Sequence, residues 1–259
     1  MRYIDWNIKC YCQIDKIVSF LKQQILNSNC IVALQEVMPE KAEVIKKNLE
    51  PDYHIIYSLD YYPSNDEFDT DNRRLGVMFA ISKDIEIAES GVFERCIFPE
   101  RTLYATISVD GIERKIVNFH SLTGVSFKMG KAVQYRRFAE SVDLFKPDIL
   151  SMDANEPKID HYYIEQMEFF DQGDSGKGAR IFFDELRKCG LVDAYANQYD
   201  IEKYKRGEPL VISHIINQVI PRRYDFVFVK ENLHIKKIDY YYQEACDASS
   251  DHAMIVVEI

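Results

Sequence analysis

Six apolar segments of the sequence carry, at or near their ends, polar residues that could take part in chemistry. A carboxylate at the end of a strand is most often solvated or caps a turn. A histidine beside an apolar strand usually has a structural hydrogen-bond partner. Taken one at a time, these residues therefore have ordinary explanations. The segments are DWNI with Asn7, ALQEV with Glu36, VNFHS with His120, LSMDAN with Asp153 and Asn155, RYDFVFV with Asp225, and SDHAM with Asp251 and His252.

The same residues are harder to explain separately when they are considered together. Asp153 and Asn155 are two positions apart, so a strand would direct both side chains to one face. Glu36 ends a run that is apolar enough to be wholly buried, where an unpaired carboxylate is costly. A shared divalent cation removes this cost, and oxygen ligands without sulfur suit Mg²⁺ or Mn²⁺ better than zinc. This composition favours metal-assisted attack of water on a phosphate ester.

The ordered series DWN, LQE, NFH, MDAN, RYDFVFV and SDH closely resembles the endonuclease/exonuclease/phosphatase superfamily, which has the deoxyribonuclease I-like fold. The resemblance extends over residues 1–259, with the motifs in the expected order. A single three-residue match would be weak, but six matches in order are a strong signal. The resemblance implies a four-layer α/β sandwich, with two packed, mostly antiparallel sheets flanked by helices, and a metal-dependent phosphoric ester hydrolase that uses Mg²⁺ or Mn²⁺.

The resemblance also implies a metal-binding side of the site. Glu36 would be the principal metal ligand, and Asn7 would lie beside it, touching the metal or the scissile phosphate. Asp251 would serve the metal site or support a histidine. His120 matches the second histidine found in the deoxyribonuclease, sphingomyelinase and inositol-phosphatase branches of the superfamily.

The remaining motif residues match the water-activating and phosphate-binding positions of the superfamily. By resemblance, Asp153 would orient or deprotonate the attacking water, and Asn155 would hold that water or a phosphate oxygen. His252 would contact the scissile phosphate and stabilise its developing charge. Asp225 would hydrogen-bond His252, a pairing that raises the pKa of an imidazole.

Three positions depart from the superfamily pattern. Lys9 stands two residues beyond Asn7, where some abasic-site endonucleases have an acid, so a second-metal role is unsupported there. Met152 replaces the glycine that usually precedes the catalytic Asp, a change we expect to affect packing. The segment SHIIN (213–217) occupies the region where many relatives carry Thr-Trp, so the substrate contacts made there are open.

Several basic residues are candidates for binding the substrate phosphate. Arg101 opens a strand near the place where relatives often have a phosphate-binding arginine, although a solvated edge arginine is an equal alternative. Arg73 and Arg74 lie in a polar loop (61–74), where either specificity or plain surface charge explains them. After His120, one further group could form a rim of the cleft or a solvated helix face: Ser121, Thr123, Lys128, Lys131, Arg136 and Arg137.

The elements that must position these residues are mostly strands. Alternating or continuously apolar segments predict about a dozen strands, at 2–8, 30–37, 53–59, 75–82, 85–93, 103–109, 115–121, 148–155, 223–229, 233–242 and 253–259. The run at 30–37 is expected to be buried on both faces, and 109–113 is expected to be a hairpin turn with its glycine in the turn. Helical spacing predicts helices at 14–26, 39–49, 131–145 and 178–189, the last ending at Gly190. The stretch 171–180 is expected to be a flexible loop whose GDSGKG falls short of a phosphate-binding loop.

Length and composition limit the class of protein. The 259 residues contain no linker or repeat, so a single domain over 1–259 is predicted. The net charge of −10 argues against a wholly basic, DNA-wrapping surface, but a bound cation would still permit a phosphate substrate. The six cysteines form no CxxC motif, and Cys30 and Cys189 are expected to be core thiols. Neither a signal peptide nor a membrane segment is predicted, which favours a cytoplasmic protein.

The leading functional hypothesis is an Mg²⁺-dependent phosphodiesterase that acts on nucleic acid, with DNA favoured. One alternative keeps the chemistry and changes the substrate to phosphotyrosyl-DNA ends, inositol phosphates, sphingomyelin or a small nucleotide. No apolar hairpin for lipid entry is evident, which disfavours sphingomyelin. A second alternative is a non-catalytic binding module on the same fold, against which the complete motif series counts.

Overall fold

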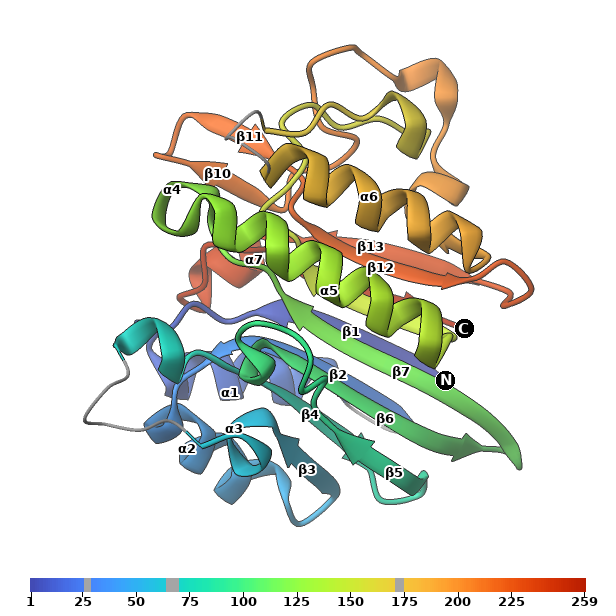
Figure 1. Cartoon of the computed structure of the whole chain (residues 1–259). Helices are drawn as coiled ribbons and strands as arrows, with labels where there is room; N and C mark the ends of the chain where they lie inside the picture. The colour runs from blue at the N-terminus through green and yellow to red at the C-terminus, as the bar shows by residue number, and fades with distance from the viewer. Residues whose placement is uncertain (26–28, 64–69, 171–174) are drawn as a thin grey trace.

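Two six-stranded sheets form the centre of the protein (Figure 1). The structure is a computed structural model, and it describes residues 1–25, 29–63, 70–170 and 175–259. The first sheet has the order β13 (Lys237–Tyr241), β14 (Met254–Glu258), β1 (Arg2–Asn7), β2 (Cys30–Val37), β4 (Gly76–Ser82) and β3 (Tyr53–Tyr57). The second has the order β5 (Glu86–Gly91), β6 (Thr102–Val109), β7 (Ile112–His120), β8 (Ile149–Asp153), β12 (Asp225–Lys230) and β9 (Leu191–Asp193). A separate pair, β10 (His214–Ile216) and β11 (Ile220–Arg222), forms a short hairpin.

Each large sheet is mostly antiparallel and has one parallel pair near its middle. In the first sheet this pair is β1 with β2, and in the second it is β7 with β8. Parallel strands run in the same direction, so the carboxyl ends of both strands in a pair lie at the same edge of the sheet. The polar residues that end these four strands are thereby brought toward one end of the molecule.

Helices cover the outer face of each sheet and complete four layers. One core lies between the first sheet and α1 (Ile14–Gln24), α2 (Pro39–Leu49) and α7 (Tyr242–Asp247). A second core lies between the two sheets, and a third lies between the second sheet and α5 (Met129–Phe145) and α6 (Ser175–Lys188). Two one-turn helices, α3 (Ser58–Tyr61) and α4 (Gly124–Phe127), lie in connections. The expected four-layer α/β sandwich is confirmed.

The strand at 30–37 and the turn at 109–113 form as predicted. Alternate side chains of β2 enter the helix-covered core and the core between the sheets, so the strand is buried on both faces. Asp110 and Gly111 join β6 to β7 with φ values of 52° and 74°. This left-handed pair suits a two-residue hairpin turn, and glycine adopts that conformation without steric cost.

Some predicted boundaries are wrong. The stretch 171–180 is not a loop throughout: residues 171–174 lie outside the described residues, and α6 begins at Ser175. Gly178 serves close packing, because a Cβ there would stand 2.7 Å from the backbone of Ala132 on α5. The strand predicted at 233–242 is limited to β13, and the one predicted at 53–59 ends at Tyr57, where α3 begins.

Two further sequence predictions concern buried cysteines and membrane-spanning helices. Cys30 and Cys189 are buried, as expected. Within the described ranges, no helix is both long enough and apolar enough to cross a bilayer.

Candidate active site

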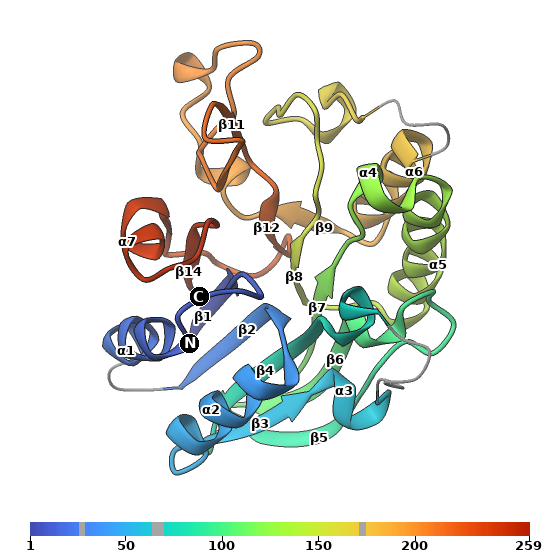
Figure 2. The same ribbon diagram turned by 90° about the vertical axis from the view of Figure 1, so that its left-hand side faces the viewer.

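The polar residues singled out in the sequence gather at the carboxyl ends of the two parallel strand pairs. Asn7 and Glu36 lie at the ends of β1 and β2, and His120 and Asp153 end β7 and β8. Asp225 begins β12 directly opposite Asp153 in the antiparallel register. Figure 2 views the molecule from this end, with α4 and the β10–β11 hairpin on two sides of the strand ends.

A β-bulge turns the carboxylate of Glu36 into the site. In a regular strand Glu36 would share the face of Val32 and Leu34, which enter the core under the helices. The register of β2 on β4 instead shifts between Leu34 and Val37, and Glu36 has a φ of 58°. A bulge re-aims a side chain in this way. Left-handed backbone at a non-glycine residue is uncommon and is typical of functional sites.

Four side chains form the first group of the site, which we call the carboxylate group: Asn7, Glu36, His120 and Asp153. Asn7 Nδ2 donates to Asp153 Oδ2 at 2.8 Å and to Glu36 Oε1 at 3.3 Å. His120 Nε2 lies 3.6 Å from an oxygen of each carboxylate. Potential ligand atoms of Glu36, His120 and Asp153 all lie within 4.8 Å of one another. Two carboxylates held this close favour a bound cation, and their oxygen atoms suit a hard divalent ion.

Asp153 is fixed by amide donors, and its pKa is raised. Its Oδ1 accepts from the backbone N–H of Asn155 at 2.9 Å, and its Oδ2 accepts from Asn155 Nδ2 at 3.3 Å. Burial, opposed by the nearby His252 cation and reinforced by the Asp225 and Glu36 carboxylates, raises the pKa of Asp153 to about 7. A carboxylate with a pKa near neutrality can exchange a proton at physiological pH.

The Asn155 backbone is held by a buried ion pair behind the site. Asn155 has a φ of 49°, and its carbonyl accepts from Lys131 Nζ at 2.7 Å. Lys131 Nζ also donates to Glu156 Oε1 at 2.8 Å, and both of these side chains are buried. Lys131 is therefore engaged with protein groups, which contradicts its suggested place on the rim of the cleft. Arg136 and Arg137 are exposed on α5.

His252 and Asp225 form a buried pair on the other side of Asp153. His252 Nδ1 lies 2.9 Å and 3.1 Å from the two carboxylate oxygens of Asp225, so Nδ1 carries a proton and donates it. Burial alone would lower the pKa of His252, but the Asp225 and Asp153 carboxylates outweigh it and raise that pKa to about 10. The ring is consequently a cation at neutral pH. Ligand atoms of Asp153, Asp225 and His252 lie within 4.8 Å of one another.

His120 has the opposite electrostatic environment because Arg101 lies beside it. Arg101 Nη1 donates to His120 Nδ1 at 3.0 Å, which leaves the proton of the neutral ring on Nε2, facing the carboxylates. Burial, the Arg101 cation and the His252 cation hold the pKa of His120 well below its usual range. Arg101 is 3% exposed, so the alternative of a solvated edge arginine is wrong.

The other two candidate arginines and Asp251 lie further out. Arg73 is bound by Glu100, with Nε 2.6 Å from Oε1, and Glu100 directly precedes Arg101 in the chain. Arg74 lies near Tyr57 and is partly buried. The Asp251 carboxylate is 3.3 Å from Lys9 Nζ, and both side chains are about two-fifths exposed. These three residues are not part of the carboxylate group.

Comparison with solved structures identifies the fold. The chain matches D. rerio TDP2 complexed with a single-strand DNA product at 14% identity and a TM-score of 0.65, covering 99% of this chain and 97% of that one. It matches an endonuclease/exonuclease/phosphatase family protein from Bacteroides thetaiotaomicron at 17% identity and a TM-score of 0.63, covering 99% of this chain and 96% of that one. It also matches the mannosyl-6-phosphatase Bt3783 of that organism at 17% identity and a TM-score of 0.62, covering 100% of this chain and 98% of that one. The chain has the same DNase I-like α/β sandwich fold as these structures. No protein-family profile and no curated protein matches the sequence.

Beneath the site, the chain carries a buried polar layer that sequence reasoning missed. Gln35 Nε2 donates to Asp5 Oδ1 at 2.6 Å and to Asn118 Oδ1 at 2.8 Å, which links the two sheets. Asp5 precedes Asn7 by two residues, and Asn118 precedes His120 by two. The sequence did contain a signal for this layer, because residues two apart in a strand have their side chains on the same face. The layer holds β1, β2 and β7 in register below the carboxylate group.

A second missed residue is His214, within the segment SHIIN that departs from the superfamily pattern. Its ring stacks on His252, with centroids 4.4 Å apart and planes inclined by 25°. His214 lies 38 positions before His252 in the sequence, and nothing in local spacing indicates the contact. The departure itself was the only hint.

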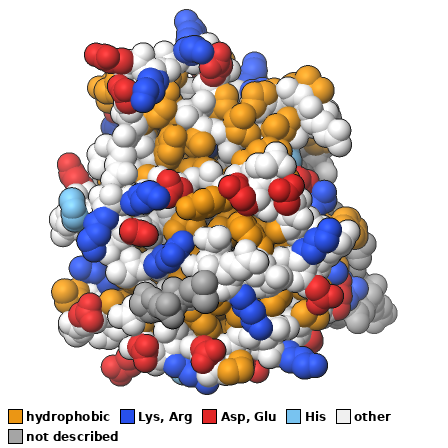
Figure 3. Space-filling model, turned by 180° about the vertical axis from the view of Figure 1, so that it is seen from behind, with side chains coloured by type: hydrophobic (Ala, Val, Ile, Leu, Met, Phe, Trp, Pro, Cys, Tyr) orange, Lys and Arg blue, Asp and Glu red, His pale blue; other side chains and the backbone are white. Residues whose placement is uncertain are grey.

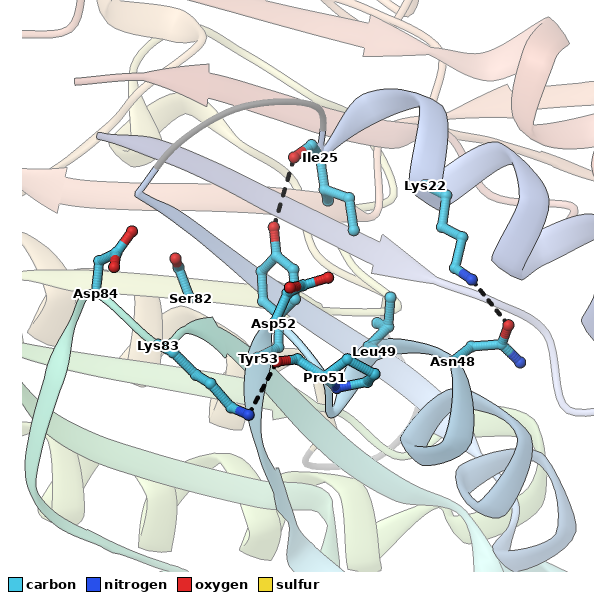
Figure 4. Close-up of a pocket in the computed structure, with 10 residues that line it drawn as sticks. All are labelled: Lys22, Ile25, Asn48, Leu49, Pro51, Asp52, Tyr53, Ser82, Lys83 and Asp84. Carbon is cyan, nitrogen blue, oxygen red and sulfur yellow. Dashed lines mark hydrogen bonds between the residues drawn. The ribbon is translucent and has the colours of Figure 1, made fainter.

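A hollow unrelated to the site lies at the other end of the molecule (Figure 4). It has a volume of about 630 Å³ and lies near the start of β3 and the end of β4. Lys22, Lys83, Asp52 and Asp84 are among its lining residues. Ser82 on β4 pairs with Tyr53 on β3, and the neighbouring Ile81 pairs with Ile31 near the start of β2. Glu36 lies near the end of β2, at the opposite edge of the sheet. This hollow contains none of the motif residues.

Proposed function

We propose that the protein is a divalent-metal-dependent phosphodiesterase that hydrolyses nucleic acid, with DNA the favoured substrate. The observation that carries the proposal is the position of Asp153 between two unlike groups. On one side lie Glu36 and Asn7, and on the other lies the cationic His252 with Asp225. An acid–base group between a metal-binding side and a phosphate-stabilising side is the arrangement that hydrolysis of a phosphate ester requires.

The donor atoms of the carboxylate group fit Mg²⁺, with Mn²⁺ as a second possibility. Glu36 would hold the ion, with Asn7 beside it, because both offer oxygen donors without sulfur. When bound, the ion would neutralise charge on the phosphate oxygens and lower the pKa of a coordinated water. His120 is less suited to act as a ligand, because its Nε2 carries the proton in the tautomer that Arg101 imposes.

Asp153 would take a proton from the attacking water. Its pKa of about 7 keeps a useful fraction of the carboxylate deprotonated at neutral pH while leaving it basic enough to accept a proton. Asn155 would hold the water or a phosphate oxygen, since its side chain already lies against Asp153. Amide hydrogen bonds to both oxygens of Asp153 would keep the carboxylate oriented during the step.

His252 would stabilise the charge that develops on the phosphate. Its Nδ1–H is committed to Asp225, so its Nε2–H is the group available to an oxyanion. A buried cation in a site of low polarity stabilises such charge more strongly than it would in water. Arg101 and His120 would assist from the metal-binding side, where the arginine lies against the imidazole.

Two observations bear on the substrate. The TDP2 structure to which this chain is similar contains a single-strand DNA product, which supports a nucleic-acid phosphodiester. On the face seen from behind, acidic and basic side chains are interspersed rather than gathered by sign (Figure 3). The net charge of −10 supports a substrate held mainly through its reacting phosphate rather than through a long basic track.

A sugar phosphate is a second candidate. It is favoured by the similarity to a mannosyl-6-phosphatase, which covers 98% of that chain. The chemistry assigned to Asp153 and His252 would be unchanged, and only the group attached to the phosphate would differ.

A substrate panel with and without metal tests the proposal. Purified protein is incubated in Mg²⁺ with plasmid, single-stranded and abasic DNA, RNA, 5′-phosphotyrosyl DNA, inositol phosphates, sphingomyelin and mannose 6-phosphate. We expect DNA cleavage that EDTA abolishes and added Mg²⁺ restores. Cleavage of mannose 6-phosphate alone would select the second candidate. Inert protein across the whole panel, with Mg²⁺ or Mn²⁺ present, would contradict both and favour a binding module.

A further inference from the structure

The ring of His214 covers one face of His252. The two ring centroids are 4.4 Å apart, and Tyr224 lies on a nearly parallel plane, 5.9 Å from the His214 centroid. His252 is thus restrained in two ways, by Asp225 at its edge and by His214 on its face. Restraint matters for a histidine, because rotation about its second side-chain torsion has broad energy wells.

The His214 ring is itself held in place. Its Nδ1 lies 2.9 Å from the carbonyl oxygen of Asp251, which only accepts, so Nδ1 carries the proton and donates. The backbones of His214 and His252 form an antiparallel bridge, and the N–H of Ala253 donates to the Ser213 carbonyl at 2.7 Å. Rotation of the His214 ring would therefore break a hydrogen bond between two segments that are already joined.

The preceding residue, Ser213, fixes the other partner of His252. Its buried Oγ accepts from the backbone N–H of Tyr224 at 2.8 Å and from that of Asp225 at 3.1 Å. The dipeptide Ser213–His214 thus contacts both the Asp225 backbone and the His252 ring. One short segment thereby sets the position of the acid and the orientation of the imidazole.

Metal binding by His214 is a weaker explanation for the same geometry. Ligand atoms of His214, Asp251 and His252 lie within 4.8 Å of one another. The two imidazoles, however, are inclined by only 25°, so the lone pairs in their planes run nearly parallel and do not converge on one ion. The Asp251 carboxylate lies against Lys9, and both Nδ1 atoms are committed to oxygen acceptors.

We propose that His214 is a positioning residue for His252, acting by stacking its flat ring on the imidazole so that Nε2 keeps its direction toward the phosphate. This proposal rests on the function proposed above. Nearly parallel stacking of flat unsaturated rings is favourable. Misplacement of a reacting group by about 1 Å can cost on the order of 100-fold in rate, so a loss of this restraint should be measurable in kcat.

The kinetic test compares two variants at this position with a matched control. His214→Phe keeps a flat ring without the hydrogen bond, His214→Ala removes both, and His54→Ala removes an exposed histidine from β3, far from the site. With bis(4-nitrophenyl) phosphate and Mg²⁺, we expect kcat to fall roughly 10- to 100-fold in His214→Ala with KM nearly unchanged. His214→Phe should recover most of that loss, and His54→Ala should match wild type. Wild-type kcat in His214→Ala, or equal losses in the Phe and Ala variants, would overturn the proposal.

A second measurement is independent of turnover. In protein labelled at its histidine rings, NMR should show one sharp His252 ring environment in wild type and His214→Phe, and a broadened or shifted one in His214→Ala, at equal thermal stability. An unchanged His252 signal in His214→Ala would contradict the positioning role even if the protein hydrolysed nothing. Inactive wild type with the expected NMR change would instead contradict the proposed function and leave the positioning role supported.

Discussion

The two sides of the site contain one buried histidine each, and these histidines carry different charges. His120 is 2% exposed and His252 is 6% exposed, so burial is nearly the same. Arg101 donates to His120, and that ring is neutral, whereas Asp225 accepts from His252, and that ring is a cation. Burial lowers the pKa of both rings, so the neighbouring charge decides which ring is neutral and which is a cation.

The difference in charge between the two histidines agrees with the role proposed for each side of the site. A neutral imidazole beside Glu36 and Asp153 adds no positive charge that would compete with a metal cation. A cationic imidazole on the opposite side provides charge where a phosphate oxyanion would develop. Five substitutions should break or sharpen this comparison, and they are given in order of decreasing expected effect.

Asp153→Asn should have the largest effect, because Asp153 touches both sides of the site. We expect kcat to fall by about 1,000-fold, the scale on which a general base contributes. The matched control is Asp84→Asn, at the hollow shown in Figure 4, where an exposed aspartate should be dispensable. Steady-state rates on a phosphodiester in Mg²⁺ measure both. Comparable activity in the Asp153 variant and the control would show that Asp153 is not the base.

Removing each histidine in turn compares the two sides directly. His252→Ala removes a cation and should lower kcat by about 100-fold, as loss of a charge-stabilising donor does. His120→Ala removes a neutral ring and should cost about 10-fold, with a weaker response to Mg²⁺ than wild type. Titration of the rate with Mg²⁺ in both variants separates these effects. A larger loss in the His120 variant would reverse the assignment of the two sides.

Asp225→Asn should change the pH dependence of activity. The pKa of His252 is raised above its ordinary value of 6.5 to about 10, so the cation is present below about 10 and is lost as pH rises through it. Without the Asp225 charge, this pKa should fall, and the alkaline decline of kcat should move from near 10 toward 6.5. A pH–rate profile from about pH 5 to about pH 10.5 brackets both the ordinary and the raised value and measures the shift. An alkaline limb that stays in place would mean that His252 is not the group responsible.

The raised pKa of His252 should also make the stability of the fold depend on pH. A histidine whose pKa is raised on folding stabilises the fold fully below its unfolded value, and this stabilisation is lost as pH rises through the folded value. Unfolding experiments on metal-free protein should therefore show a decline between pH 6.5 and about 10 that is smaller in Asp225→Asn.

Lys9→Ala should have the smallest effect. Lys9 pairs with Asp251 at 3.3 Å, but both side chains are about two-fifths exposed, and exposed ion pairs contribute about 0–1 kcal/mol. We expect less than about a twofold change in kcat/KM and little change in melting temperature. A loss approaching that of His120→Ala would show that Lys9 contacts the substrate or orders Asp251 for catalysis.

The sequence by itself determined which residue types stand at the strand ends. Asp153 follows an apolar run long enough for one strand, and Asn7 and His120 end strands whose alternation is clear. Strand period and burial are local properties, so they can be read from neighbouring residues. The order of the motifs then carried the resemblance to the superfamily, and with it the layered fold.

Tertiary structure decided how those residues face one another and what charge they carry. Glu36 enters the site through a bulge that its flanking apolar residues do not indicate. Arg101 lies 19 residues before His120, and Asp225 lies 27 residues before His252, so neither protonation state follows from local sequence. Lys131 and His214 likewise acquire their partners only when α5 and the β10–β11 hairpin pack against the strand ends. Electrostatic and stacking interactions depend on distance in space, and the sequence records distance only along the chain.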